Sequence, residues 1–195
     1  ANHVFRNDGN LHFTDMAAAW GVGQRGFSNG AVYVDLNNSG ALDLVINNIN
    51  APASIYRNDA RIRNGNSYLT VQLKGDGANS AGIGTKLIAK QHGTMQLLEQ
   101  SPTRGFQSSV DQRLHFGFGR DSTLDSLIVV WPDRKFQLLT NVALNRTLVV
   151  EQKSARGQYR GTPHAPFGAA ATKPIFADVT AQLPLAYVHE ENSFN

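Results

Sequence analysis

Short runs of β-branched and aromatic residues recur along this chain, and turn-forming residues separate them at intervals of about 8–12 residues. Tyr68–Leu73 alternates apolar and polar side chains, as a strand with one buried face does. Ser126–Trp131 is apolar after its first residue, which indicates a central strand covered on both faces. The pattern predicts an all-β fold, an antiparallel sandwich or barrel. The expected strands are His3–Asn7, Leu11–Thr14, Ala31–Asp35, Leu42–Asn47, Ser54–Asn58, Tyr68–Leu73, Ile83–Lys90, Met95–Gln100, Arg113–Phe116, Ser126–Trp131, Phe136–Leu139 and Thr147–Glu151.

The loop Asp35–Asp43 carries oxygen-bearing side chains at positions one, three, five and nine, and a glycine at position six. Calcium takes about six to eight oxygen ligands, and the glycine allows a sharp turn between them. An EF-hand is excluded, because position twelve is Ile46 and strand-like runs flank the loop. A metal-free turn, in which Asp and Asn side chains bond local N–H groups, is the alternative. The candidate calcium ligands are Asp35, Asn37, Ser39, the backbone carbonyl of Ala41, and Asp43.

The 195 residues include no cysteine, which excludes disulfides, thiolate metal sites and cysteine nucleophiles. The formal net charge is +3, and the basic residues are scattered along the sequence, which argues against nucleic-acid binding. No apolar run approaches the roughly 18 residues of a membrane-spanning helix, and the first residues do not show the charged-then-apolar pattern of a signal segment. Ala1–Arg6 reads as a start within a structural element, so we expect a piece excised from a longer protein.

Two segments recur within the chain. Val4–Asp8 is repeated as Ile55–Asp59, and Phe13–Ala17 as Phe176–Thr180. The first offset is 51 residues (55 − 4), and a repeat near this length suits a β-propeller blade. Phe27–Ala31, followed by the Asp35–Asp43 loop, resembles the FG-GAP or VCBS-type propeller repeat. The resemblance implies a calcium loop between two blade strands, although Asn37 and Ser39 stand where the repeat usually has Asp.

Four short pieces follow one another across roughly Ser67–Lys153: Gly82–Leu87, Arg104–Ser109, Leu114–Gly119 and Val130–Pro132. In these pieces the segment is similar to the ASPIC/UnbV domain, which commonly follows such repeats. One departure is Arg134, because the turn after Trp131 and Pro132 usually carries glycine there. The resemblance implies a β-domain without an agreed activity.

These observations predict four segments. Residues 1–66 are expected to be a propeller-blade fragment, 67–153 an ASPIC/UnbV β-domain, 154–174 an exposed linker, and 175–195 the start of a further propeller repeat. A single blade leaves strand edges and apolar surface uncovered. We expect the tail segment Ile175–Val179 to dock on that blade. The uncovered face is expected to contain Val32, Val34, Leu44 and Ile46.

Other groups of polar residues give only weak evidence of a binding or catalytic site. Arg104 and Phe106 are the best ligand-binding candidates on a loop, but a core-facing Phe106 with a structural Arg104 is the favoured interpretation. His115 is expected to be a packed or hydrogen-bonded structural residue. His189–Glu191 lacks the spacing of a zinc site.

The function expected from this sequence is non-catalytic. The chain would be a calcium-stabilised binding or scaffolding segment that contacts a glycan, a protein or the missing propeller blades, without a nucleic-acid partner or a transmembrane segment. The resemblance to propeller repeats implies an extracellular or outer-membrane location in a bacterium. The alternative is an accessory region of a polysaccharide-degrading enzyme whose active site lies in missing blades.

Overall fold

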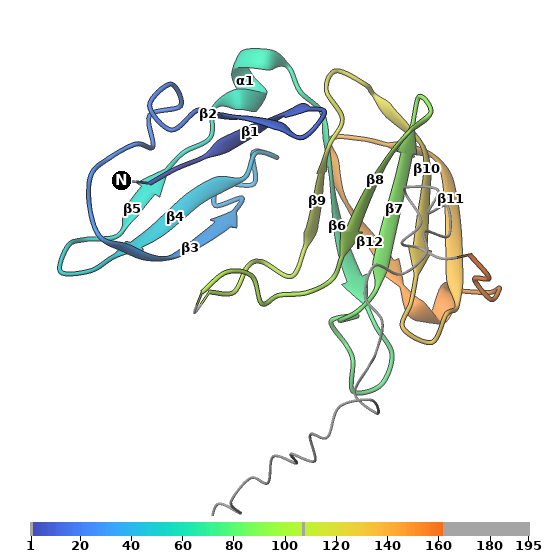
Figure 1. Cartoon of the computed structure of the whole chain (residues 1–195). Coiled ribbons are helices and arrows are strands. Elements are labelled where there is room, and N and C mark those ends of the chain that lie inside the picture. Colours follow the sequence, from blue (N-terminus) through green and yellow to red (C-terminus); the bar gives the residue numbers. More distant parts are fainter. Residues whose placement is uncertain (1, 107, 162–195) are drawn as a thin grey trace, which may run out of the picture. The chain divides into compact units, whose positions relative to one another are not determined.

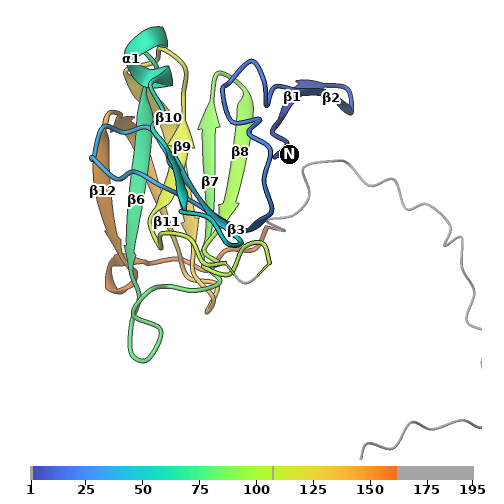
Figure 2. The same ribbon diagram turned by 90° about the vertical axis from the view of Figure 1, so that its left-hand side faces the viewer.

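The computed structural model describes residues 2–106 and 108–161. Seven strands in its C-terminal part form two sheets that share one core (Figures 1 and 2). They are β6 (Tyr68–Lys74), β7 (Lys86–Gln91), β8 (Thr94–Glu99), β9 (Leu114–Gly117), β10 (Thr123–Val130), β11 (Phe136–Ala143) and β12 (Arg146–Glu151). One sheet has the order β11-β10-β7-β8 and the other β12-β6-β9. The expectation of an all-β fold is therefore confirmed, with each predicted strand of this part present.

The core lies between these two sheets because side chains two residues apart on a strand point to the same side. Leu127 and Val129 of β10 are fully buried, as are Leu69 and Val71 of β6. Trp131 follows β10 and is 1% exposed, and its indole N–H donates to Gln137 Oε1 at 3.2 Å. The members of this core cluster all fall between Leu69 and Ala155, and none comes from the first 66 residues.

One strand pair differs from the expected antiparallel arrangement. β12 runs parallel to β6, in register from Arg146 opposite Leu69 to Glu151 opposite Lys74. The neighbouring pairs, β6 with β9 and β7 with β8 and β10, are antiparallel as expected. The alternation of apolar residues determines which face of a strand is buried, but it carries no information on the direction of the neighbouring strand.

The first 66 residues form two small antiparallel sheets and one helical turn. β1 (Phe5–Gly9) pairs with β2 (His12–Asp15), and a second sheet has the order β3-β4-β5. Its strands are β3 (Ser28–Val34), β4 (Asp43–Asn48) and β5 (Ser54–Tyr56), and the helix α1 spans Ala60–Asn64. The five expected strands are present, whereas α1 was not predicted. A two-stranded and a three-stranded sheet do not by themselves show a propeller blade.

Apolar side chains occupy both faces of the β3-β4-β5 sheet. Directly paired residues share a face, so Val32 lies with Val45 and Ile55 on one side. Leu44 lies with Tyr33 and Tyr56 on the other. The prediction that Val32, Val34, Leu44 and Ile46 form one uncovered face is therefore wrong, because Leu44 and Ile46 sit opposite to Val32 and Val34. Ile46 is also buried, at 5% exposure, and the other three are half-buried.

Ordered contacts extend beyond Lys153, where the sequence predicted the domain to end. A 3-10 turn, η1 (Gln152–Ser154), leads to the buried Ala155. Phe136 N–H then donates to Gly157 O, and the rings of Phe136 and Tyr159 meet edge to face at 5.8 Å. The chain up to Gly161 belongs to one compact unit. The rest of the expected linker and the predicted tail strand Ile175–Val179 lie outside the described residues.

The turn between β10 and β11 keeps the backbone conformation that glycine would favour. Arg134 has φ +65°, and its N–H donates to Trp131 O at 2.8 Å. A left-handed conformation costs a non-glycine residue about 1 kcal/mol or more. The Arg134 guanidinium offsets this cost by donating to Tyr159 O at 3.0 Å, which also fastens the segment after η1.

Candidate functional site

The Asp35–Asp43 loop is held together by hydrogen bonds from its own backbone. Asp35 accepts at both carboxylate oxygens, from the N–H of Ser39 at 2.9 Å and of Gly40 at 2.8 Å. Asn37 Oδ1 accepts from the same Ser39 N–H at 3.0 Å, and Ser39 Oγ accepts from Ala41 N–H at 3.4 Å. These bonds wrap the loop around its first carboxylate.

Asp43 joins the loop to the chain that follows β5. It is only 2% exposed, yet both carboxylate oxygens accept backbone hydrogen bonds. One comes from Leu36 N–H at 3.2 Å and the other from Asn58 N–H at 2.8 Å. The Asn58 side-chain amide also donates a hydrogen bond through Nδ2 to Leu42 O at 3.0 Å. Asp43 therefore fixes the loop against the start of α1.

The donor set of this loop fits a hard cation. It offers two carboxylates, an amide oxygen, a hydroxyl and a backbone carbonyl, which are the oxygen ligands that calcium prefers. A carboxylate oxygen that accepts one N–H still has a free lone pair, so the backbone bonds leave room for a metal ion. Within the described residues, no three His, Cys, Asp or Glu side chains gather into a metal-binding group. A calcium ion here would therefore depend on Asn37, Ser39 and Ala41 as well as the two carboxylates. The same hydrogen bonds also satisfy the metal-free turn, so both alternatives remain compatible with the geometry.

The loop rests on the ring of Tyr68, at the start of β6. Gly40 has φ +82°, and a Cβ built on it would lie 2.0 Å from Tyr68 Cε1. Position six of the loop must therefore be glycine for two reasons, its backbone conformation and its contact with the ring. Arg61 of α1 lies over the same ring, 5.0 Å from its centroid, and donates to Ser39 O. The loop, α1 and β6 thus meet around one aromatic side chain.

His115 of β9 completes this contact. Its ring stacks on Tyr68, with centroids 5.5 Å apart and planes inclined by 10°, and its Nδ1 lies 3.1 Å from Thr70 Oγ1. Burial lowers the pKa of His115 below its ordinary value, and the nearby charge of Arg113 acts in the same direction, while Asp35 opposes both. His115 is consequently neutral at pH 7, and its packing and hydrogen bond agree with the structural role expected from sequence.

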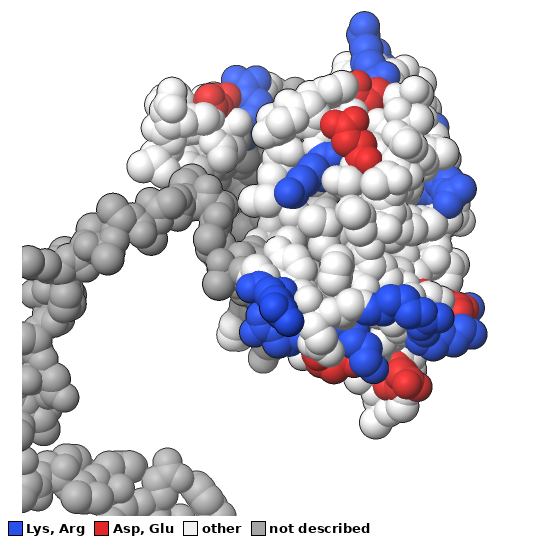
Figure 3. All heavy atoms as spheres, turned by 90° about the vertical axis from the view of Figure 1, so that its right-hand side faces the viewer, with Lys and Arg blue, Asp and Glu red and all other residues white. Residues whose placement is uncertain are grey.

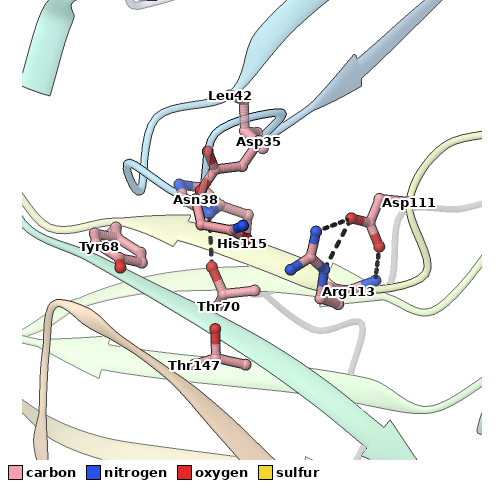
Figure 4. Close-up of a pocket in the computed structure, with 9 residues that line it drawn as sticks. All are labelled: Asp35, Asn38, Leu42, Tyr68, Thr70, Asp111, Arg113, His115 and Thr147. Atoms are coloured by element: carbon pink, nitrogen blue, oxygen red, sulfur yellow. Dashed lines mark hydrogen bonds and ion pairs between the residues drawn. The ribbon is translucent and has the colours of Figure 1, made fainter.

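A small cavity separates the loop from the sheet beneath it (Figure 4). Asp35, Asn38 and Leu42 reach it from the loop, and Thr70, Thr147 and His115 from the sheet. Its volume is about 30 Å³, enough for one or two water molecules. At its side, Arg113 donates through Nε to Asp111 Oδ2 at 2.8 Å. Burial acts against ionisation of Asp111, but hydrogen bonds from Arg113 hold the pKa of this carboxyl below its usual value.

The structure places the candidate pair Arg104 and Phe106 in different surroundings. Arg104 donates to the backbone carbonyl of Glu99 at 3.0 Å and lines a cavity of about 130 Å³. Phe106 is 69% exposed, so the favoured prediction of a core-facing Phe106 is wrong. Arg104 has a structural contact of the kind that the same prediction assigned to it.

Comparison with known proteins identifies the second part of the chain. Residues 75–157 match the family model described as ASPIC and UnbV. This match covers 83 residues (157 − 75 + 1), which include β7 to β12 and every motif piece quoted above. The ASPIC and UnbV segment thus lacks only β6 of the two-sheet structure. No curated protein matches the chain.

The motif glycine Gly82 has a packing role in the ASPIC and UnbV segment. Its φ is +64°, and a Cβ there would lie 3.0 Å from Trp131 Cζ3. The Gly82–Leu87 and Val130–Pro132 motif pieces therefore pack against each other in the fold.

Sequence reasoning missed Tyr68, Arg61 and Arg113 as parts of the contact beneath the loop. Tyr68 was recognised only as a strand residue, because an aromatic ring at the start of a strand carries no sign of its partner. α1 gives one weak signal, Gly65, which ends the helix with φ +67°. Arg113 is two residues from Asp111, but that spacing is common in turns.

Among the described residues, the longest helix is α1, whose five residues are far too few to cross a bilayer.

Proposed function

We propose that this chain is a non-catalytic, calcium-stabilised scaffolding segment of a cell-surface or secreted protein, in which residues 2–66 bind a further β-sheet of the same type. The exposed apolar residues carry this proposal. Of the fifteen exposed large apolar side chains among the described residues, ten lie between Phe5 and Ile62. They include Phe27 at 81% and Ile55 at 66% exposure. Apolar exposure concentrated in one small region is typical of a protein-binding surface.

The apolar residues on both faces of the β3-β4-β5 sheet favour a binding partner on each side. Ile55 is exposed on one face and Tyr33, at 40% exposure, on the other. A sheet with apolar side chains on both faces gains stability when other elements cover both. Stacked repeats have this property, because each repeat buries its faces against its two neighbours. The FG-GAP or VCBS-type resemblance of this part therefore agrees with the exposure pattern, and the missing propeller blades are the partners we propose.

The contact beneath the loop favours a structural role over catalysis. A hydroxyl, an imidazole and a carboxylate line the same small cavity: Thr70, His115 and Asp35. These are the group types of a nucleophilic triad. Thr70, however, is only 7% exposed, and the adjoining cavity of about 30 Å³ is far below the size of a substrate pocket. Thr70 and His115 bond each other within the sheet, Asp35 accepts from its own loop, and the cavity between them is too small for a substrate.

Self-association tests the scaffolding proposal, because a second copy offers a further β-sheet of the same type in pure solution. Sedimentation velocity between about 1 and 100 μM should show concentration-dependent dimers, since this range brackets interfaces of μM affinity. The Phe27→Ser/Ile55→Ser variant should remain monomeric and retain its melting temperature, because both side chains are already exposed.

The matched control is Ile83→Ser/Leu138→Ser, which removes two exposed apolar side chains from the ASPIC and UnbV segment. It should associate like the unmodified chain. A chain that stays monomeric throughout, or two variants with equal effects, would contradict the proposal.

Calcium should raise the melting temperature of the full chain. Without the ion, Asp35 and Asp43 hold two negative charges in one loop, and binding to the folded state alone stabilises it by mass action. At a calcium concentration about 100 times Kd, we expect a rise of about 5–10 °C relative to chelator. Asp35→Asn should abolish this rise, whereas Asp76→Asn, an exposed Asp in another loop, should preserve it. Identical melting curves in calcium and chelator would favour the metal-free turn.

A further inference from the structure

A basic surface forms where the β10–β11 turn meets the segment after β12. We call this the basic surface and define it by six exposed side chains: Lys74, Arg134, Lys135, Lys153, Arg156 and Arg160. They are distant in sequence, but contacts join them into one region. Lys74 and Lys153 both contact Glu151, at 3.5 and 2.9 Å. Arg156 N–H donates to Phe136 O, next to Lys135, and Tyr159 N–H donates to Arg134 O.

The charge of this region is unbalanced. Six cations and three carboxylates, Asp76, Asp133 and Glu151, give a formal charge of +3 (6 − 3), which equals that of the whole chain. Figure 3 shows Lys and Arg gathered along the lower part of one face, with smaller acidic patches between and beside them. The fold therefore collects basic residues that look scattered in the sequence.

Two of the cations are held in place without being neutralised. The guanidinium of Arg134 donates to the backbone oxygens of Tyr159 and Gly161, and that of Arg156 to those of Lys153 and Ala155. A carbonyl oxygen orients a guanidinium but leaves its full charge available. These side chains lose less conformational freedom when an anion binds, which favours binding.

From this arrangement we propose that the basic surface binds an acidic polysaccharide with carboxylates on its sugar rings. Guanidinium groups recognise carboxylates in a planar, two-bond geometry. The interspersed Asp133 and Glu151 would repel a polymer as densely charged as nucleic acid, but they can accept hydrogen bonds from sugar hydroxyls. An anionic membrane fits less well, because none of the exposed large apolar side chains belongs to this surface.

A groove at one edge of the basic surface gives the polymer a place to enter. Lys74 belongs to both, and the groove has a volume of about 430 Å³, within the range of small-ligand sites. Arg113 and Asp111 also line the groove, where they pair with each other, and Gln72 and Gln112 add amides that can donate to and accept from hydroxyls. Lys74 and these amides suit a sugar that bears a carboxylate.

Binding of polygalacturonate oligomers to the full chain tests the proposal. Affinity should fall with increasing salt, and fully methyl-esterified oligomers of the same length should not bind, because their carboxylates are neutral. The Lys135→Gln/Lys153→Gln/Arg160→Gln variant should bind at least about tenfold more weakly, as expected for the loss of three charge contacts. The Lys135 and Lys153 side chains contact only neighbouring carboxylates, so this variant should fold normally, which an unchanged melting temperature would verify.

The control variant is Arg25→Gln/Arg63→Gln/Arg146→Gln, which removes the same number of charges outside the basic surface. Its affinity should stay within about twofold of the unmodified chain. Equal weakening in both variants would mean that only net charge matters and would overturn the assignment. Tighter binding of a DNA oligomer or of anionic vesicles than of polygalacturonate at the same salt concentration would also overturn it.

Discussion

A fragment of residues 67–161 should fold cooperatively alone, whereas residues 1–66 should not. The core cluster lies entirely between Leu69 and Ala155, so the fragment keeps all of it. Within the described residues 2–66, only four apolar side chains are buried: Ala17, Val22, Ala41 and Ile46. So small a buried set cannot offset the conformational entropy of ordering that part. Urea unfolding followed by circular dichroism should give one sigmoidal transition for the first fragment and none for the second.

A shorter fragment, 67–153, tests whether residues 154–161 contribute to the stability of the domain. It loses the buried Ala155 and the contact between Phe136 and Tyr159, and it should therefore unfold at a lower urea concentration. Equal midpoints would mean that residues 154–161 add nothing to stability. A cooperative transition in residues 1–66 would show that this part does not need a partner.

Gly40→Ala should destabilise the full chain by about 2–4 kcal/mol, the sum of backbone strain and overpacking. The new Cβ would need the space that Tyr68 occupies. The ring cannot move easily, because it stacks on His115 and lies beneath Arg61. Chemical denaturation of the two proteins under the same conditions measures this difference.

Gly105→Ala is the matched control, because Gly105 has φ +75° and a Cβ added there would meet no atom within 4 Å. It should cost only the strain, about 1 kcal/mol. In a Tyr68→Ala background, Gly40→Ala should lose most of its excess cost, which a double-mutant cycle would report as coupling. If the two glycine substitutions lowered the free energy of unfolding equally, the contact with the Tyr68 ring would not contribute to the effect of Gly40→Ala.

The strands of this fold could be predicted because their sequence pattern is local. Alternation identified β6, and an apolar run identified β10 as the centre of its sheet. Strand boundaries differed by a few residues, since the residues that end a strand also occur within turns. The faces of the β3-β4-β5 sheet were assigned wrongly, because apolar residues on both sides remove the alternation that reveals a buried face.

The surroundings of the candidate site could not be predicted, because they depend on contacts between distant residues. Gly40 and Tyr68 are 28 positions apart (68 − 40), and Tyr68 and His115 are 47 apart (115 − 68). α1 has five residues, too few to form without tertiary contacts, so Arg61 reaches the loop only in the folded chain. The basic surface was missed for the same reason, since its residues come from three separate stretches of sequence.

The parallel pairing of β12 with β6 has a mechanical consequence. The chain enters the domain at Tyr68, the first residue of β6, and leaves it after Glu151, the last residue of β12. Because the two strands are parallel, these two points lie at opposite ends of the strand pair. Tension applied through the chain therefore pulls the two strands along their length in opposite directions. Their hydrogen bonds carry the load together instead of opening one after another. A segment tethered at both ends would gain resistance to stretching from this one pair of strands.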